Sequence, residues 1–398
     1  MKISKWILPL IVIAQFCCTS LWFAVNAVMI DLSMNFHLGS NALEQLTSAI
    51  QFGFIIGTLT FAIFTIADRF SPSKVFCFSA LLGASLNALM LLEVNTLTSL
   101  LLLRFLTGFF LAGIYPIGMK IAADYYEKGL GKSLGFLVGA LVLGTAFPHF
   151  LKSFDGILSW KMLVLSTSCL ASIGGLLMLV FVSDGPYRKA SQALDFGAVF
   201  RIFKGKEFRV AAIGYFGHMW ELYTFWMLVP ILLTTCFLEY PWLSFNVNWW
   251  AFVIIGMGSL GCVLGAYLAA YLGTQKTATW ALFLSFLCCC VAPFMLEWAS
   301  PVFFVLFLIF WGIVVIADSP LFSTLVASSA PSATKGTALT IVNCIGFSIT
   351  IISIQILTIA RAQTNGYFIY WLLALGPMIG LLFIYKNRKN TNEKDISL

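Results

Sequence analysis

Charge is scarce in this sequence: only 10% of its 398 residues are Asp, Glu, Lys or Arg, where a soluble domain carries roughly 25%. Hydrophobic residues make up 60% of the chain, and the mean hydropathy is +0.96. A soluble fold could not hide so much apolar surface. The composition therefore predicts a protein embedded in a lipid bilayer.

Motifs for catalysis and metal binding are also missing. The ten cysteines include Cys17-Cys18 and Cys288-Cys289-Cys290, but they lie inside apolar runs without CxxC or Cys/His spacing. No Ser/His/Asp order, HExxH or Walker motif is present. We therefore expect no enzyme activity, no cofactor and no metal, and we interpret the cysteines as small buried hydrophobic residues.

The formal charge of +7 does not indicate nucleic acid, because the Lys and Arg residues are scattered over short polar segments instead of sharing one amphipathic face. The polar segments separate apolar runs, each long enough for the roughly 20 residues of a spanning helix. These runs predict twelve spans, at 6–30, 45–66, 74–92, 97–119, 131–151, 161–182, 208–236, 248–272, 276–296, 300–329, 336–360 and 366–385.

Twelve spans return both termini to one side, which the positions of the basic residues identify as the cytoplasm. The opposite side would hold only Lys152, Lys161 and Arg361, with Arg104 left inside the membrane. The first run resembles a signal peptide but continues to Ile30 without a small-residue cleavage site, so we expect an uncleaved helix. The predicted location is the cell inner membrane.

A long polar stretch divides the chain. Residues 183–207 form a predicted cytoplasmic linker between two six-helix bundles, residues 1–182 and residues 208–398 with a short tail. The halves show a repeat at an offset near 204 residues, since Gly108 pairs with Gly312 and Pro116 with Pro320. Parallel repeats of this kind build many transporters, with the solute site at their interface.

Few ionisable residues lie deep in the predicted spans. Arg104 is a permanent cation in the fourth span, and such residues usually face a bundle interior or a wet cavity. Glu221 and Asp318 are the only deep acids, and His218 lies three residues before Glu221 on the same helix face. We predict that His218, Glu221 and Asp318 handle a proton. The alternatives are a structural tie between helices for His218 and Glu221, and a structural partner of Arg104 or of a helix-end dipole for Asp318.

Polar and aromatic residues form stripes that suit a cavity for an organic solute. On the first span, Gln15, Thr19, Trp22 and Asn26 recur at helical spacing, whereas Asn343 and Gln355 on the eleventh span do not share a face. Packing remains the alternative for any single aromatic residue. The candidate substrate-binding residues are Arg104, Trp22, Asn26, Tyr115, Gln15, Thr19, Tyr215 and Trp220.

Two motifs resemble the major facilitator superfamily. The loop IADRFSPSK, from Ile66 to Lys74, matches the family's loop after the second span at Asp68 and Arg69, although Phe64 and Ser71 replace its glycines. Arg104 to Gly113 is similar to the family's fourth-helix motif, and the segments around Gly214 and Ala317 look like a bacterial permease-like subgroup. With the twelve spans and the linker, the resemblance covers nearly the whole chain.

The resemblance implies an all-α membrane protein that transports a small-molecule substrate by alternating access. We expect a monomer in the lipid bilayer that takes up a small organic solute with protons, Arg104 anchoring a carboxylate or another anion. Asp68 and Arg69 would act in gating, Asp68 against the helix that opens near Gly336. The alternatives are proton-antiport efflux of a metabolite or drug and, from another class, a non-transporting membrane sensor.

Overall fold

The computed structural model is built from helices. It describes residues 5–126, 130–154, 158–188, 201–240, 242, 245–331, 334–364 and 366–395, and these ranges contain no strand. Within them, 11 helices are long and apolar enough to cross a membrane. Together with a shorter apolar helix at the start, they correspond to the twelve expected spans.

The elements follow the predicted spans in order. In the first half the later spans are α4 (Ala42–Ile63), α6 (Pro72–Ala88) with η1 (Leu89–Leu91), α7 (Leu97–Leu111) with α8 (Tyr115–Tyr125), α9 (Leu130–Lys152) and α10 (Trp160–Phe181), and α5 (Ile66–Arg69) lies in the loop after α4. The second half holds α12 (Lys206–Leu238), α13 (Val247–Leu272), α14 (Thr274–Trp298), α15 (Pro301–Ala317) with α16 (Ser319–Ser329), α17 (Lys335–Gln363), and η3 (Tyr367–Ala374) with α18 (Leu375–Asp395).

The first span is broken, whereas the sequence predicted one continuous helix. It consists of α1 (Ile7–Thr19), α2 (Ala24–Ala27) and α3 (Met29–Phe36). The 13 residues of α1 reach about 20 Å, short of the roughly 30 Å hydrocarbon layer. Non-helical backbone at this depth is tolerated only where protein or water satisfies it, so the break between α1 and α2 needs a partner elsewhere in the fold.

The 204-residue repeat is visible in how helices touch. A Cβ atom added at Gly108 of α7 would overlap the carbonyl oxygen of Ile50 on α4, and one added at Gly312 of α15 would overlap that of Ile254 on α13. A second pair of contacts repeats at the same offset. A Cβ atom added at Gly57 would overlap the carbonyl oxygen of Phe109, and one added at Gly261 would overlap that of Ile313. Small residues that let backbones approach are typical of membrane helix packing.

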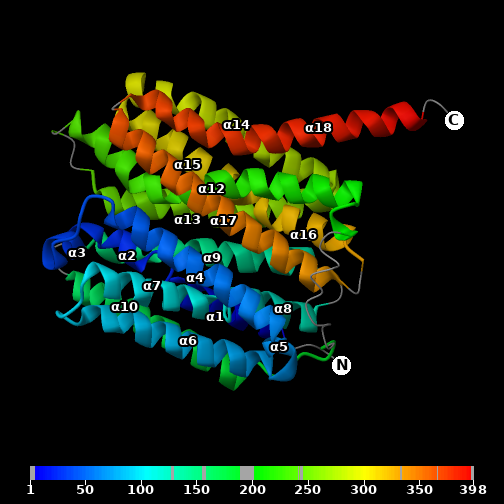
Figure 1. Cartoon of the computed structure of the whole chain (residues 1–398), viewed down its shortest axis with the longest axis horizontal. Coiled ribbons are helices and arrows are strands. Elements are labelled where there is room, and N and C mark those ends of the chain that lie inside the picture. The colour runs from blue at the N-terminus through cyan, green and yellow to red at the C-terminus, as the bar shows by residue number, and fades with distance from the viewer. Residues whose placement is uncertain are drawn as a thin grey trace.

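The two halves of the chain lie side by side, with α1 to α10 below and α12 to α18 above in Figure 1. They meet mainly where α9 packs on α13 and α4 packs on α17. The loop helix α5, the start of α1 and the end of α18 lie at one end of the bundle, which we call the Asp68 end, and α3 lies at the other, which we call the Glu44 end (Figure 1).

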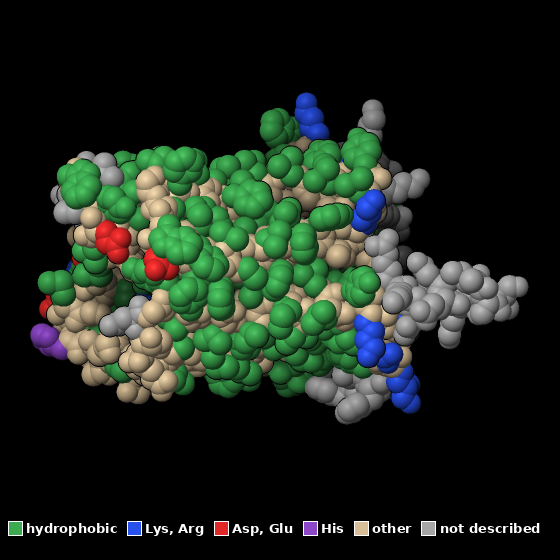
Figure 2. Space-filling view, turned by 90° about the horizontal axis from the view of Figure 1, so that it is seen from above, with side chains coloured by type: hydrophobic (Ala, Val, Ile, Leu, Met, Phe, Trp, Pro, Cys, Tyr) green, Lys and Arg blue, Asp and Glu red, His purple; other side chains and the backbone are tan. Residues whose placement is uncertain are grey.

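Charge separates along the bundle. On the face shown in Figure 2, hydrophobic side chains cover the middle, most Lys and Arg side chains gather toward the Asp68 end, and Asp and Glu side chains lie toward the Glu44 end. An apolar girdle between two polar ends is the surface that a bilayer-spanning protein requires.

Candidate solute site

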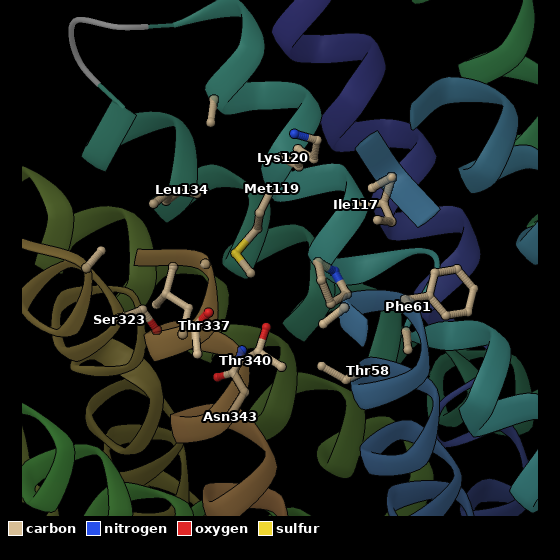
Figure 3. Close-up of a pocket in the computed structure, with 18 of the residues that line it drawn as sticks. Thr58, Phe61, Ile117, Met119, Lys120, Leu134, Ser323, Thr337, Thr340 and Asn343 are labelled. Atoms are coloured by element: carbon tan, nitrogen blue, oxygen red, sulfur yellow. The ribbon is translucent and has the colours of Figure 1, made fainter. Parts of the chain in front are cut away.

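A cavity of about 450 Å³ lies between the two halves, toward the Asp68 end. Its walls come from α4, α8 and α9 on one side and from α16 and α17 on the other, as Figure 3 shows for Thr58, Met119, Lys120, Thr340 and Asn343. The volume falls within the range of small-molecule pockets. A cavity between two repeats is where a transporter is expected to hold its solute.

Two broken spans supply opposite walls of this cavity. α8 starts after Ile114 with Pro116 in its first turn, and α16 starts after Asp318 with Pro320 in its first turn. Proline lacks the backbone N–H and favours the first helical turn, so each proline fixes where the new helix begins. The half-helices then carry Met119 and Lys120 on one wall and Ser323 and Thr324 on the other.

The polar lining of the cavity is mostly uncharged. Hydroxyl and amide groups line it from both halves: Thr58, Thr65, Ser323, Thr324, Thr337, Thr340 and Asn343. Its charged side chains are Asp68 and Lys120, which pair with each other at 2.9 Å. Most of the lining can therefore donate or accept hydrogen bonds without carrying charge.

Aromatic rings from both halves close the inner end of the cavity. Phe54 and Phe347 lie one helical turn deeper than the lining residues Thr58 and Asn343, and their ring centroids are 4.6 Å apart. Trp22 stacks on Phe347 and on Tyr223, each at 5.6 Å. The rest of the cluster is Phe23 and Trp226, whose centroids are 6.2 Å apart.

Polar contacts close the Glu44 end between the halves. Gln355 donates to the Ser48 hydroxyl at 2.9 Å, and Asn246 donates to the carbonyl of Ser153 at 2.7 Å. Arg361 approaches Glu44 to 3.9 Å. Polar contacts therefore join the halves at this end, whereas the cavity lies between them toward the other.

A buried acid and histidine lie behind the cavity wall. His218 Nδ1 lies 2.8 Å from Asp318 Oδ1, and both side chains are 1% exposed. Tyr215, whose ring lies 5.9 Å from that of His218, donates its hydroxyl to Asn343 Oδ1 at 2.8 Å. Asn343 lines the cavity, so Tyr215 links the cavity wall to the His218–Asp318 pair.

Glu221 does not join His218, although the two were expected to form one site. Glu221 Oε1 accepts hydrogen bonds from Ser285 at 2.6 Å and from the Trp311 indole at 2.5 Å. The three-residue spacing places both residues on α12, but their side chains contact different neighbours. His218 binds Asp318 on the break before α16, and Glu221 binds α14 and α15.

Arg104 lies outside the cavity and binds the broken first span. Its side chain is fully buried and donates to the carbonyl of Leu21 at 3.0 Å and to that of Trp22. None of the described acidic side chains pairs with it. A cation suits the carbonyl end of a helix, so Arg104 satisfies the backbone that the break leaves open.

The profile of the Major Facilitator Superfamily matches residues 11–354. This chain belongs to that superfamily. As a member it is a transporter and not an enzyme, and the twelve-helix architecture that the sequence predicted is confirmed.

Solved structures of other superfamily members share the fold. A mutant of the nucleoside transporter NupG superposes with a TM-score of 0.70 at 15% identity, covering 96% of this chain and 99% of that one. The proton:xylose symporter XylE bound to 6-bromo-6-deoxy-D-glucose gives 0.70 at 14% identity, covering 96% and 94%. A search of curated proteins finds no match.

Most of the other residues predicted to bind substrate or to act in gating have partners away from the cavity or lie beside it. Asn26 donates to Thr47 at 3.0 Å, Thr19 donates to the carbonyl of Gln15, and Trp220 donates to the carbonyl of Leu372, away from the cavity. Gln15 is fully buried. Tyr115 opens α8 beside the lining residue Pro116, and the exposed Arg69 donates to Thr65.

The sequence reasoning missed several site residues of this transporter. Thr58 and the hydroxyls of α16 and α17 line the cavity, and Tyr223 and Phe347 belong to the aromatic cluster at its inner end. Gln51 is fully buried on α4, two turns before Thr58. Hydroxyl residues are common in all the spans, so composition alone could not select these. Asn343 and Gln355 do bind different partners, as their spacing predicted.

Proposed function

We propose that this superfamily member is a secondary active transporter that moves a small organic solute by alternating access. The observation that carries the proposal is the cavity between the halves at the Asp68 end, opposite a Glu44 end at which hydrogen bonds join the halves. Two six-helix bundles, joined by the linker at 183–207, would rock about the midplane. The part of the linker at 189–200 lies outside the described residues.

We place the Asp68 end in the cytoplasm and the chain in the inner membrane. The gathering of Lys and Arg at that end supports this orientation under the positive-inside rule. The cavity would then face the cytoplasm in this state. A monomer suffices, because both walls of the cavity come from one chain.

The solute that suits the cavity is polar but uncharged. Hydroxyl and amide groups dominate its lining, and its cation Lys120 already has an acid partner. Arg104, expected from sequence to anchor an anion, is occupied by two backbone carbonyls in this state. The nucleoside and xylose transporters among the solved structures carry solutes of this kind.

The coupling ion is a proton, which we assign first to His218 and Asp318. Their contact is buried and linked through Tyr215 to Asn343 on the cavity wall. A solute that binds Asn343 would disturb the Tyr215 hydrogen bond and thereby the pair. Glu221 is the second proton-handling group, within the α12–α14–α15 packing.

Asp68 acts as a gate latch, with Arg69 beside it on α5. In this state Asp68 binds Lys120 of its own half, and the cavity separates it from Gly336 and Thr337 in the first turn of α17. Closing the cavity would bring its carboxylate to the positive end of α17. Asp68→Asn should then favour the state described here, measured as increased labelling of cysteines placed in the cavity.

Vesicles test the function directly. The full-length protein is reconstituted into vesicles, which are incubated with a cell metabolite extract in the presence or absence of a pH gradient. The solutes that accumulate inside the vesicles are identified by mass spectrometry. We expect one class of uncharged polar solute to accumulate only when the gradient is present. No flux of any solute would favour a non-transporting sensor. Accumulation that is driven only by the opposite pH gradient would indicate proton-antiport efflux.

A further inference from the structure

The floor of the cavity is an aromatic cluster built from both halves. Thr58 and Phe54 follow each other by one turn on α4, as do Asn343 and Phe347 on α17. The first member of each pair lines the cavity, and the second packs against its counterpart at 4.6 Å. A solute that moves inward from the cavity therefore meets these rings first.

Polar groups without partners belong to this cluster or lie one helical turn from it. The amide of Gln51 and the indole N–H groups of Trp22 and Trp226 have no hydrogen-bond partner among the described residues, and all three side chains are fully buried. An unsatisfied buried polar group is costly, because it has lost its hydrogen bonds to water without gaining others. Such groups are rare in native structures and call for an explanation, which a ligand can provide.

The position of Gln51 places it at the interface between the halves. On α4 it lies one turn from Phe54, which packs on Trp22, and one turn from Thr47, which binds Asn26. The same helix contacts α17 through Ser48, one turn before Gln51. Gln51 therefore lies one turn from Phe54 on α4, and Phe54 packs on Trp22 from the broken first span and on Phe347 from α17.

The charged groups near this cluster are already engaged. Arg104 binds the carbonyls of Leu21 and Trp22, and His218 binds Asp318. The amide of Gln51 offers both a donor and an acceptor. A carboxylate could satisfy only the donor, whereas a hydroxyl or a cyclic amide could satisfy both.

We propose that Trp22, Gln51, Tyr223 and Phe347 form the innermost solute subsite, and that it binds an uncharged, ring-shaped solute carrying both donors and acceptors. This inference rests on the proposed transport function and adds the solute class. The ring lies against Trp22, in place of its contacts with Tyr223 and Phe347. Its polar atoms bind the Gln51 amide and the Trp22 N–H when the rings part.

Three matched pairs of probes test the class: D-glucose with D-glucuronate, nicotinamide with nicotinate, and uridine with uridine monophosphate. Binding to the purified full-length protein is measured by thermal shift and by calorimetry. We expect at least one neutral member to bind and its charged counterpart to bind at least tenfold more weakly. The inference is overturned if charged members bind as tightly or if no neutral member binds.

Variants test the residues. Gln51→Leu and Trp22→Phe should each raise the Kd of the bound neutral probe about tenfold, the effect of one lost hydrogen bond in a desolvated site. Gln45→Leu, at an exposed position of the same helix, should leave Kd unchanged. An unchanged Kd in Gln51→Leu with an unchanged melting temperature would remove the subsite.

The failures of the two proposals are distinguishable. If vesicles accumulate only charged solutes from the extract, transport stands and the uncharged class is rejected. If vesicles accumulate no solute while a neutral probe binds in a Gln51-dependent way, the subsite stands and transport is rejected.

Discussion

The two halves of the chain share their packing but differ in their charges. Gly108 and Gly312 are 204 residues apart, and each lets its helix pack closely on a neighbouring backbone: Gly108 on α4 and Gly312 on α13. The residues that precede α8 and α16 also correspond at this offset, as Ile114 and Asp318. The second helix of the broken span thus begins at a matching position in both halves.

None of the four deep ionisable residues described above recurs in the other half. At the same offset the counterpart of Arg104 is Leu308, that of Asp318 is Ile114, that of His218 is Ala14 and that of Glu221 is Cys17, and all four counterparts are buried. A charge in the membrane interior is expensive to maintain. Packing therefore explains the repeated positions, and each charge needs an explanation of its own.

The largest expected effect comes from Asp318→Asn. The variant has an uncharged residue before α16, just as the first half has the uncharged Ile114 before α8. Without an exchangeable proton, the variant should lose uptake driven by a pH gradient but retain solute exchange. Glu297→Gln, at an exposed acid of the same half, is the control. Driven uptake at the normal rate in Asp318→Asn would contradict the assignment.

Glu221→Gln sharpens the comparison within the second half. The amide oxygen can still accept from Ser285 and Trp311, so the fold should persist. Since these bonds do not reach the cavity wall, we expect driven uptake to fall less than in Asp318→Asn. A larger loss than in Asp318→Asn would make Glu221 the principal proton site.

Arg104→Leu copies the other half's Leu308 into the first half and should destabilise the protein. It leaves the buried carbonyls of Leu21 and Trp22 without their donor, at a cost of about 1–3 kcal/mol for each carbonyl. The melting temperature in detergent measures this loss, with Arg104→Lys as a milder change that keeps the charge. An undiminished melting temperature in Arg104→Leu would exclude a structural role at the break.

Gly108→Ala and Gly312→Ala test whether the repeated contact carries equal weight in each half. Each added methyl group meets a backbone oxygen, so the helices must separate, and overpacking of this kind costs about 1–3 kcal/mol. Gly131→Ala has open space around its Cβ atom and should be neutral or stabilising. If the two glycine variants lose unequal amounts of stability, the two halves share the shape of the backbone contact but not its contribution to stability.

The smallest effect is expected at a charge pair outside the membrane. Lys161 donates to Glu93 at 2.7 Å, and this hydrogen bond and the attraction of the two charges lower the pKa of Glu93. The pair stabilises the fold slightly at a pH above the pKa that Glu93 has in the unfolded chain. This stabilisation is lost as the pH falls through the lower pKa that Glu93 has in the folded protein. Glu93→Gln should barely move the melting temperature and should remove this acid-side loss.

Some of the site was within reach of the sequence, because it depends on local pattern. The offset that pairs Pro116 with Pro320 was visible in the sequence, and both prolines lie in the first turn of a half-helix. The spacing of Asn343 and Gln355 correctly separated these two residues. The break in the first span was not predicted, since Ser20 to Phe23 contains no proline or glycine. The break persists because Arg104, more than eighty residues away in the chain, supplies the missing donors.

The sequence by itself determined the twelve spans, the family and the repeated glycines, because hydrophobic length and residue size act along a single helix. Only the tertiary structure decided that His218 contacts Asp318 and not Glu221, that Arg104 faces backbone, and which hydroxyls line the cavity. Those outcomes depend on which helices become neighbours and how they are rotated. A buried polar side chain binds whichever partner the packed helices bring within reach.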